Sequence, residues 1–170
     1  IVEVVNVDST INTLKKLAMA YGQQVECPVI GITGSNGKTT AKELLNHVLS
    51  PHKKTMCTIG NYNSTIGLPI SIFTVNGDED LCILEMGASE PKEIAELCRI
   101  AKPTMGLITN IAATHTENFG SIDNVAKTKS DLFTSLPHYG TAFINIDDDY
   151  ISTFTTNANR ITYGFNSEAD

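Results

Sequence analysis

The residues best suited to chemistry lie in a glycine-rich segment, G-I-T-G-S-N-G-K-T-T, which follows an apolar run and precedes an amphipathic stretch. Gly34 and Gly37 let the backbone turn tightly, so that its N–H groups and the positive end of the next helix converge on an anion. A lysine in such a loop supplies a cation, and a hydroxyl directly after it is suited to Mg²⁺. The segment predicts a phosphate-binding loop in which Lys38 is the cation and Thr39 or Thr40 is the metal ligand.

The spacing of this loop departs from the pattern G-x-x-x-x-G-K-[ST], because the first glycine of that pattern would fall at Ile32. The order of apolar run, Gly-Lys-Thr and helix is nevertheless the one that phosphate binding requires. We therefore interpret the loop as a variant rather than as a glycine-rich turn without a ligand.

Two later segments carry polar side chains where predicted strands end. Glu85 closes the run L-C-I-L-E, and Asn110 and His115 follow the run M-G-L-I-T. Ligands of an open parallel sheet bind at the carboxyl ends of its strands, so these groups should meet the phosphate loop there. Each of them alone is more often structural. Together with the loop, Glu85 is predicted to hold Mg²⁺ directly or through water, and His115 to belong to the same site.

Lys129 lies on the apolar side of a predicted helix that begins after Ser121. The apolar stripe of this helix contains Ile122, Val125, Ala126, Leu132 and Phe133. Lys129 follows members of the stripe by three or four residues, whereas Lys127 points away from it. An unpaired buried ammonium is costly, so Lys129 should pair with a carboxylate, extend to the rim of the fold or change its charge state.

The elements that must position these residues alternate between strand and helix. Strands are predicted at Val29 to Thr33, Leu81 to Glu85, Met105 to Ile111, Thr141 to Ile146 and, as an edge strand, Arg160 to Gly164. Helices are predicted from Asp8 or Ser9 to Gly22, and at Lys38 to Leu49, Pro91 to Ile100 and Ile122 to Leu136. Near-continuous apolar strands separated by helices are typical of an α/β fold, with a mostly parallel sheet and helices on both faces.

Two polar segments leave alternatives open. In G-N-Y-N-S-T-I-G-L-P, from Gly60 to Pro69, the Asn, Ser and Thr residues either cap a helix or line a site. The acidic run from Asp147 to Asp149 is interpreted as a solvated turn rather than a metal site.

Composition limits the class of protein. The 170 residues are 41% hydrophobic and 18% charged, enough for one real core. The net charge of −7 argues against a nucleic-acid groove, which needs clustered Lys and Arg. The four cysteines are widely spaced without C-x-x-C, which favours buried thiols in a reducing compartment. Since we find neither a membrane span nor a signal peptide, we expect a cytoplasmic location.

Five motifs occur in a characteristic order: G-I-T-G-S-N-G-K-T-T, G-N-Y-N-S-T-I-G-L-P, L-E-M-G-A-S, T-N-I-A-A-T-H and A-K-T-K-S-D-L-F. This set resembles the Mur ligases, the ATP-dependent amide-forming enzymes of bacterial peptidoglycan synthesis. Within that family, G-N-Y-N-S-T-I-G-L-P and F-G-S look most like the members that add D-alanyl-D-alanine to UDP-N-acetylmuramoyl-tripeptide.

The resemblance implies a P-loop NTPase-like central domain that uses ATP and Mg²⁺. Residues 1–24 would form a linker with a helix, and residues 25–170 would form a central ATP-binding domain that is incomplete at its C-terminal side and inactive in isolation. The implied partners are the UDP-linked tripeptide and D-alanyl-D-alanine, and the implied state is a monomer.

The resemblance also implies roles for individual residues. The catalytic residues would be Lys38, His115 and Lys129. The metal ligands would be Thr39, Glu85, His115 and Lys129, the last as a carbamate. Nucleotide binding would involve Gly34, Ser35, Asn36, Gly37, Lys38, Thr39, Thr40, Asn61, Asn63 and Asn110.

Three alternatives differ in what accompanies the phosphate loop. A P-loop kinase or GTPase-like switch would use the same loop without a metal-supporting lysine. A binding module would have no activity without further parts. Another Mur-type ligase, adding glutamate or a diamino acid, should lack G-N-Y-N-S-T-I-G-L-P.

Overall fold

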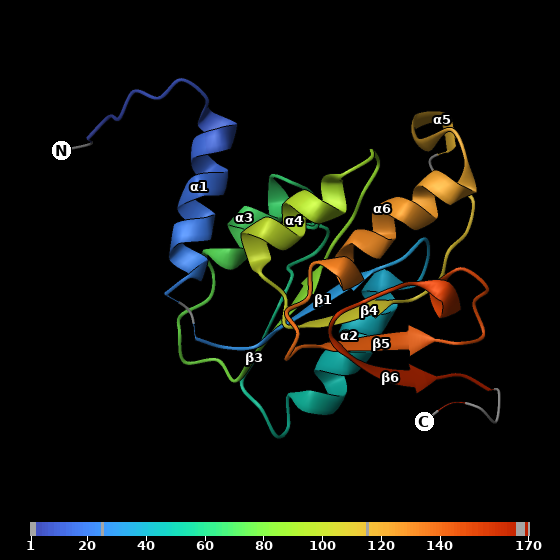
Figure 1. Ribbon diagram of the computed structural model, residues 1–170. Coiled ribbons are helices and arrows are strands. Elements are labelled where there is room, and N and C mark those ends of the chain that lie inside the picture. Colours follow the sequence, from blue (N-terminus) through green and yellow to red (C-terminus); the bar gives the residue numbers. More distant parts are fainter. Residues whose placement is uncertain (1–2, 25, 115, 166–168, 170) are drawn as a thin grey trace.

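The computed structural model describes residues 3–24, 26–114, 116–165 and 169. Over these residues the chain forms a six-stranded parallel sheet with the order β2-β3-β1-β4-β5-β6 (Figure 1). The strands are β1 (Val29–Thr33), β2 (Thr55–Cys57), β3 (Leu81–Glu85), β4 (Met105–Ile108), β5 (Thr141–Asn145) and β6 (Asn159–Tyr163). The helices are α1 (Thr10–Gly22), α2 (Lys38–Leu49), α3 (Gly67–Ile72), α4 (Glu93–Ala101), α5 (Thr116–Phe119) and α6 (Ile122–Thr134), with a 3-10 turn at Ile151–Thr153. The predicted α/β class is confirmed.

The two faces of the sheet are covered unequally. On one face, α2 packs Ala41, Leu45 and Leu49 against apolar side chains of β1 and β3. On the other face, α1, α3, α4 and α6 enclose the larger core (Figure 1). Every residue of β3 is buried and β1 is buried beyond its first residue, which explains why both strands are near-continuous apolar runs in the sequence.

Several predicted boundaries were wrong. β4 ends at Ile108 rather than Ile111, because Thr109 and Asn110 turn toward the phosphate loop and bond to it. Likewise, α4 begins at Glu93 rather than Pro91, since Lys92 has a φ of 69° and the Glu93 carboxylate accepts hydrogen bonds from the backbone before the helix. The predicted bounds of β1, β3 and α2 are confirmed, and those of α1, α6, β5 and β6 differ by one or two residues. The short strand β2 and the short helix α5 were not predicted, and a helix at α3 was only one of two alternatives for the segment from Gly60 to Pro69.

The first helix is part of the layer that covers the sheet. Ser9 caps α1 by accepting a hydrogen bond from the backbone N–H of Asn12, as the sequence predicted. Lys15 forms an ion pair of 2.8 Å with Glu96 on α4, and the Tyr21 hydroxyl donates to the carbonyl of Val75. In the described part of the chain, no helix has the length and apolar character required to cross a membrane.

Candidate active site

The glycine-rich loop delivers an uncapped helix to the carboxyl end of the sheet. Gly37 is the N-cap of α2 with a φ of 76°, and no side chain caps the helix. The N–H groups of the first turn have no acceptor within a helix, so they remain available to an anion. The Lys38 ammonium folds back over the loop and donates to the carbonyls of Gly34, at 2.9 Å, and Ser35, at 3.3 Å.

The segment after β4 holds this loop in shape. The backbone N–H of Ser35 donates to the Asn110 carbonyl, and the N–H of Asn36 donates to the Asn110 side-chain oxygen at 3.0 Å. Thr109 donates its hydroxyl to the Asn36 carbonyl at 2.6 Å. A Cβ at Gly34 would lie 1.9 Å from the Thr109 hydroxyl oxygen, so only glycine fits there. Asn110, a predicted nucleotide-binding residue, therefore supports the loop through its backbone and side chain.

Glu85 lies at the centre of a hydrogen-bonded group. The residue is 2% exposed, and its carboxylate accepts from the Thr39 hydroxyl at 2.8 Å and from the Asn63 amide at 2.7 Å. Its backbone N–H donates to the Thr58 hydroxyl at 2.9 Å. A buried carboxylate beside a hydroxyl is a hard-oxygen donor set, which suits Mg²⁺.

The sequence prediction missed Lys42, which lies one turn along α2 from Lys38. Lys42 is 1% exposed and donates to the Thr58 carbonyl at 2.8 Å, and it forms a 2.9 Å ion pair with Glu43. Since Thr58 also receives the Glu85 N–H, Lys42 fixes the peptide that positions Glu85. The signal was present in the sequence: Lys42 falls beside the apolar stripe of its helix, as Lys129 does.

Lys129 points inward, as its spacing predicted. It is 3% exposed, and no hydrogen bond or ion pair joins its ammonium to a described residue. Burial, and secondarily the positive charge of Lys38, lower the pKa of Lys129 to about 8. Lys127 on the same helix is exposed. The amine of Lys129 is thus neutral in a substantial fraction of molecules near pH 8, a requirement for reaction with an electrophile such as CO₂.

Electrostatic interactions connect Lys38 of the phosphate loop with two buried groups, Glu85 and Lys129. Burial lowers the pKa of Lys38, and the negative charge of Glu85 acts in the opposite direction. Lys38 also acts on Lys129. Hydrogen bonds thus join Thr39 and Asn63 to Glu85, and charge interactions connect Lys38 with Glu85 and with Lys129.

Other predicted residues take different positions. Thr40 and Asn61 are exposed, and the Asn61 carbonyl accepts from the N–H of Asn63. Between the two threonines left open as metal ligands, Thr39 is the one that contacts Glu85. His115 lies outside the described residues, so its role stays a prediction.

Two segments with alternative interpretations now have defined positions. In the segment from Gly60 to Pro69, Ser64 accepts from the N–H groups of Ile66 and Gly67 just before α3, whose N-cap is Ile66, and Asn63 contacts Glu85. In the acidic turn, Asp148 accepts from the N–H groups of Ile111, Tyr150 and Ile151. Asp148 thus caps the turn and anchors the segment after β4. The residues next to Asp148 in the sequence did not indicate this role.

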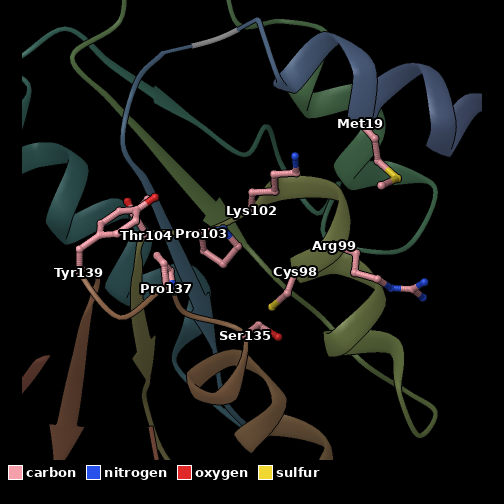
Figure 2. A pocket seen from close by; sticks show the side chains of 9 residues that line it. All are labelled: Met19, Cys98, Arg99, Lys102, Pro103, Thr104, Ser135, Pro137 and Tyr139. Carbon is pink, nitrogen blue, oxygen red and sulfur yellow. The ribbon is translucent and has the colours of Figure 1, made fainter. Parts of the chain in front are cut away.

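Among the cavities that the described residues line, two lie at opposite ends of the sheet. One of about 230 Å³ opens beside Lys38 and Asn63 and is walled by Gly87, Ser89 and Glu93, next to the phosphate loop. The other, of about 580 Å³, lies near the amino ends of β4 and β5 (Figure 2). Its lining includes Thr104 and Tyr139, together with Met19, Cys98, Arg99, Lys102, Pro103, Ser135 and Pro137. Of these two cavities, the first is the one that touches the candidate site.

The family model for the Mur ligase middle domain matches residues 32–170. A UDP-N-acetylmuramoyl-tripeptide--D-alanyl-D-alanine ligase of Bacillus subtilis is 36% identical over 98% of this chain, which covers 36% of that relative. The chain therefore spans about a third of the length of the curated relatives it matches.

Solved structures give the same result for the fold. The crystal structure of MurF from Acinetobacter baumannii superposes with a TM-score of 0.90 at 29% identity, covering 94% of this chain and 36% of that one. The MurF ligase of Thermotoga maritima in complex with ADP superposes with a TM-score of 0.86 at 34% identity, covering 96% of this chain and 40% of that one.

Proposed function

We propose, from the premise that this chain belongs to the Mur ligase family, that it forms the ATP-binding part of a ligase adding D-alanyl-D-alanine to UDP-N-acetylmuramoyl-tripeptide. Because the chain spans about a third of its curated relatives, this activity is proposed for the protein that contains it. The division into a linker at residues 1–24 and a central domain at residues 25–170 is part of this proposal, as is a cytoplasmic location.

A single observation carries the proposal. An uncapped helix N-terminus with its lysine, a buried carboxylate held by Thr39, and a buried lysine without a described partner meet at one end of one sheet. A phosphate loop alone would fit many nucleotide-binding proteins. The inward lysine beside it fits a reaction in which an anionic acceptor must approach a triphosphate.

The proposed role of the loop is to bind the phosphates of ATP and to reduce the repulsion between them and the acceptor carboxylate. The first-turn N–H groups of α2 and the Lys38 ammonium would contact the phosphates. For this, Lys38 exchanges its present acceptors, the Gly34 and Ser35 carbonyls, for phosphate oxygens. The acceptor carboxylate then attacks the γ-phosphorus, the bond to ADP breaks, and an acyl phosphate forms. The amine of D-alanyl-D-alanine attacks the acyl carbon, and inorganic phosphate and the amine proton leave as the amide forms.

The donor groups of the site fit divalent cations. Thr39 and Glu85 would hold one Mg²⁺, and His115 with Lys129, as its carbamate, would hold a second. When bound, the ions neutralise charge on the phosphates and on the attacking carboxylate. Asn63 keeps the Glu85 carboxylate oriented through the 2.7 Å hydrogen bond, and Lys42 fixes the backbone beside it through Thr58.

The rival within the family is a ligase that adds glutamate or a diamino acid. Phosphate release distinguishes the candidates when the ligase that contains this chain is given ATP, Mg²⁺, UDP-linked tripeptide and one amine at a time. We expect release that depends on both the tripeptide and D-alanyl-D-alanine. Phosphate release with glutamate or a diamino acid instead would reassign the substrate, and ADP formation with an alcohol acceptor, without release of inorganic phosphate, would indicate a kinase.

A further inference from the structure

Two cysteines that are 55 residues apart in the sequence meet at the amino ends of β1 and β3. The sulfur atoms of Cys27 and Cys82 lie 2.9 Å apart. The backbone enforces this proximity, because the N–H of Cys82 donates to the Pro28 carbonyl and Val29 is the register partner of Cys82. The contact therefore does not depend on flexible side chains alone.

The two thiols differ in their access to solvent. Cys82 is 2% exposed and belongs to the core, whereas Cys27 is half-buried in the segment that leads into β1. Burial, and then the hydrogen bond with Cys27, raise the pKa of Cys82. A dissolved oxidant consequently reaches Cys27 first, and Cys82 is reached through Cys27.

We propose that Cys27 and Cys82 form an oxidation site, at which a hydroperoxide converts the two thiols into an intramolecular disulfide. In the first step the Cys27 sulfur attacks a peroxide oxygen, the O–O bond breaks, and Cys27 becomes a sulfenic acid with release of water or an alcohol. In the second step the Cys82 sulfur attacks the Cys27 sulfur, the S–O bond breaks, and the oxygen leaves as water with the Cys82 proton. With hydrogen peroxide, two thiols and one peroxide yield one disulfide and two waters.

The geometry favours the second step over further oxidation of Cys27. A disulfide bond is about 2.05 Å long, so the two sulfurs must approach by less than about 1 Å. The resolving thiol is already in contact and needs no diffusion to reach the sulfenic acid. The site lies away from the phosphate loop, because Cys82 is near the amino end of β3 and Glu85 closes its carboxyl end.

The other two cysteines are built-in controls. Cys57 is also half-buried, but it packs in the apolar cluster on the opposite face of the sheet, and burial raises its pKa to about 11. Cys98 is buried, its pKa is raised by burial to about 12, and its sulfur contacts the Met86 sulfur at 4.0 Å. Neither has a thiol in contact.

Peptide mapping tests the proposal directly. The reduced chain is treated with hydrogen peroxide, denatured in N-ethylmaleimide, digested without reductant and analysed by mass spectrometry. We expect one cross-linked peptide pair containing Cys27 and Cys82, lighter than the reduced pair by two hydrogens and separated by dithiothreitol, while Cys57 and Cys98 carry the maleimide. A sulfinic acid at Cys27 with an alkylated Cys82, or a link from Cys27 to Cys57 or Cys98, would overturn the proposal.

A second measurement probes the pair without oxidation. Phenylarsine oxide bridges two neighbouring thiols, so the reduced chain should bind one equivalent. We expect Cys27→Ser, which alters a half-buried residue outside the strands, to weaken this binding at least 100-fold, and the matched control Cys57→Ser to leave it unchanged. Equal binding by Cys27→Ser and the unsubstituted chain would contradict the inferred pair.

Discussion

The region where α2 meets β3 and the region around α6 both bury charged side chains, but among the described residues only the first region supplies hydrogen-bond partners for them. Glu85 has the Thr39 hydroxyl and the Asn63 amide, and Lys42 has the Thr58 carbonyl and Glu43. Lys129 on α6 is equally buried, has no hydrogen bond to a described residue and is close enough to Lys38 for repulsion.

The two regions therefore differ in whether the described residues stabilise the charge that is buried there. The charges of Glu85 and Lys42 are stabilised by the fold itself, which orients the carboxylate before any ligand binds. Burial disfavours the charge of Lys129, for which no described residue provides a hydrogen bond, and an unpaired buried ammonium lowers stability. A carbamate on Lys129 would replace the cation by an anion and remove its repulsion with Lys38.

The largest expected effect follows from removing Lys129 in the ligase that contains this chain. We expect Lys129→Ala to lower ligation by about 10³-fold or more, because the supporting anion is lost. Acetate or propionate should restore part of the activity by occupying the space left by the side chain. Lys127→Ala, on the exposed side of α6, is the matched control and should retain activity. Full activity of Lys129→Ala in ligation assays would refute the carbamate role.

Removing the charge of Glu85 tests the other region. We expect Glu85→Gln to lower kcat by about 10²-fold and to raise the Mg²⁺ concentration needed for half-maximal rate. Because glutamine fills the same volume, carboxylic acids should not rescue this variant. Rescue equal to that of Lys129→Ala would remove the distinction between the two regions, and an unchanged Mg²⁺ requirement would remove Glu85 from the metal site.

Lys129 should make the free energy of unfolding of this chain depend on pH, and the sign of this dependence follows from its lowered pKa. The pKa of Lys129 is lowered from 10.5 to about 8, so the unfolded chain binds more protons than the folded chain between these values. The contribution of Lys129 to the free energy of unfolding therefore becomes more favourable as the pH rises from about 8 to 10.5. At pH 7, Lys129→Met should raise the free energy of unfolding by up to roughly 3 kcal/mol, an advantage that shrinks above pH 8.

Urea unfolding at pH 7 and pH 10 measures this difference. The control is Lys127→Met, which removes an exposed ammonium from the same helix and should change stability by less than about 0.5 kcal/mol at both pH values. A Lys129→Met variant that is less stable than the unsubstituted chain at pH 7 would show that the ammonium has a stabilising partner.

A smaller effect of opposite sign is expected at Lys42. Lys42→Met leaves the Thr58 carbonyl without its donor, which should lower the free energy of unfolding by about 1–3 kcal/mol. Glu43→Gln is the matched control, since Glu43 is largely exposed and its ion pair contributes little. If urea unfolding found Lys42→Met to be stabilising, the two buried lysines would not differ as the structure indicates.

The sequence predicted those features that have a local signature. The apolar runs of β1 and β3, the glycine-rich loop and the inward direction of Lys129 all follow from residue type and periodicity along one element. The short strand β2, T-M-C, gives no periodicity to detect and forms because it pairs with β3.

The features that the sequence did not predict depend mainly on contacts between segments that are far apart in the chain. The early end of β4 depends on bonds from Thr109 and Asn110 to a loop more than 70 residues earlier in the chain. Asp148 anchors the segment after β4 because its carboxylate accepts hydrogen bonds from three backbone N–H groups. Lys42, in contrast, could have been predicted by the periodicity argument used for Lys129.

The most direct test of the account is a crystal structure of the ligase that contains this chain, with a non-hydrolysable ATP analogue and Mn²⁺ located by anomalous scattering. We expect the phosphates on the loop from Gly34 to Thr39, one metal ion bound by Thr39 and Glu85, and a second beside a carbamate on Lys129. Phosphates bound away from this loop, or a metal ion that is absent from Glu85, would contradict it.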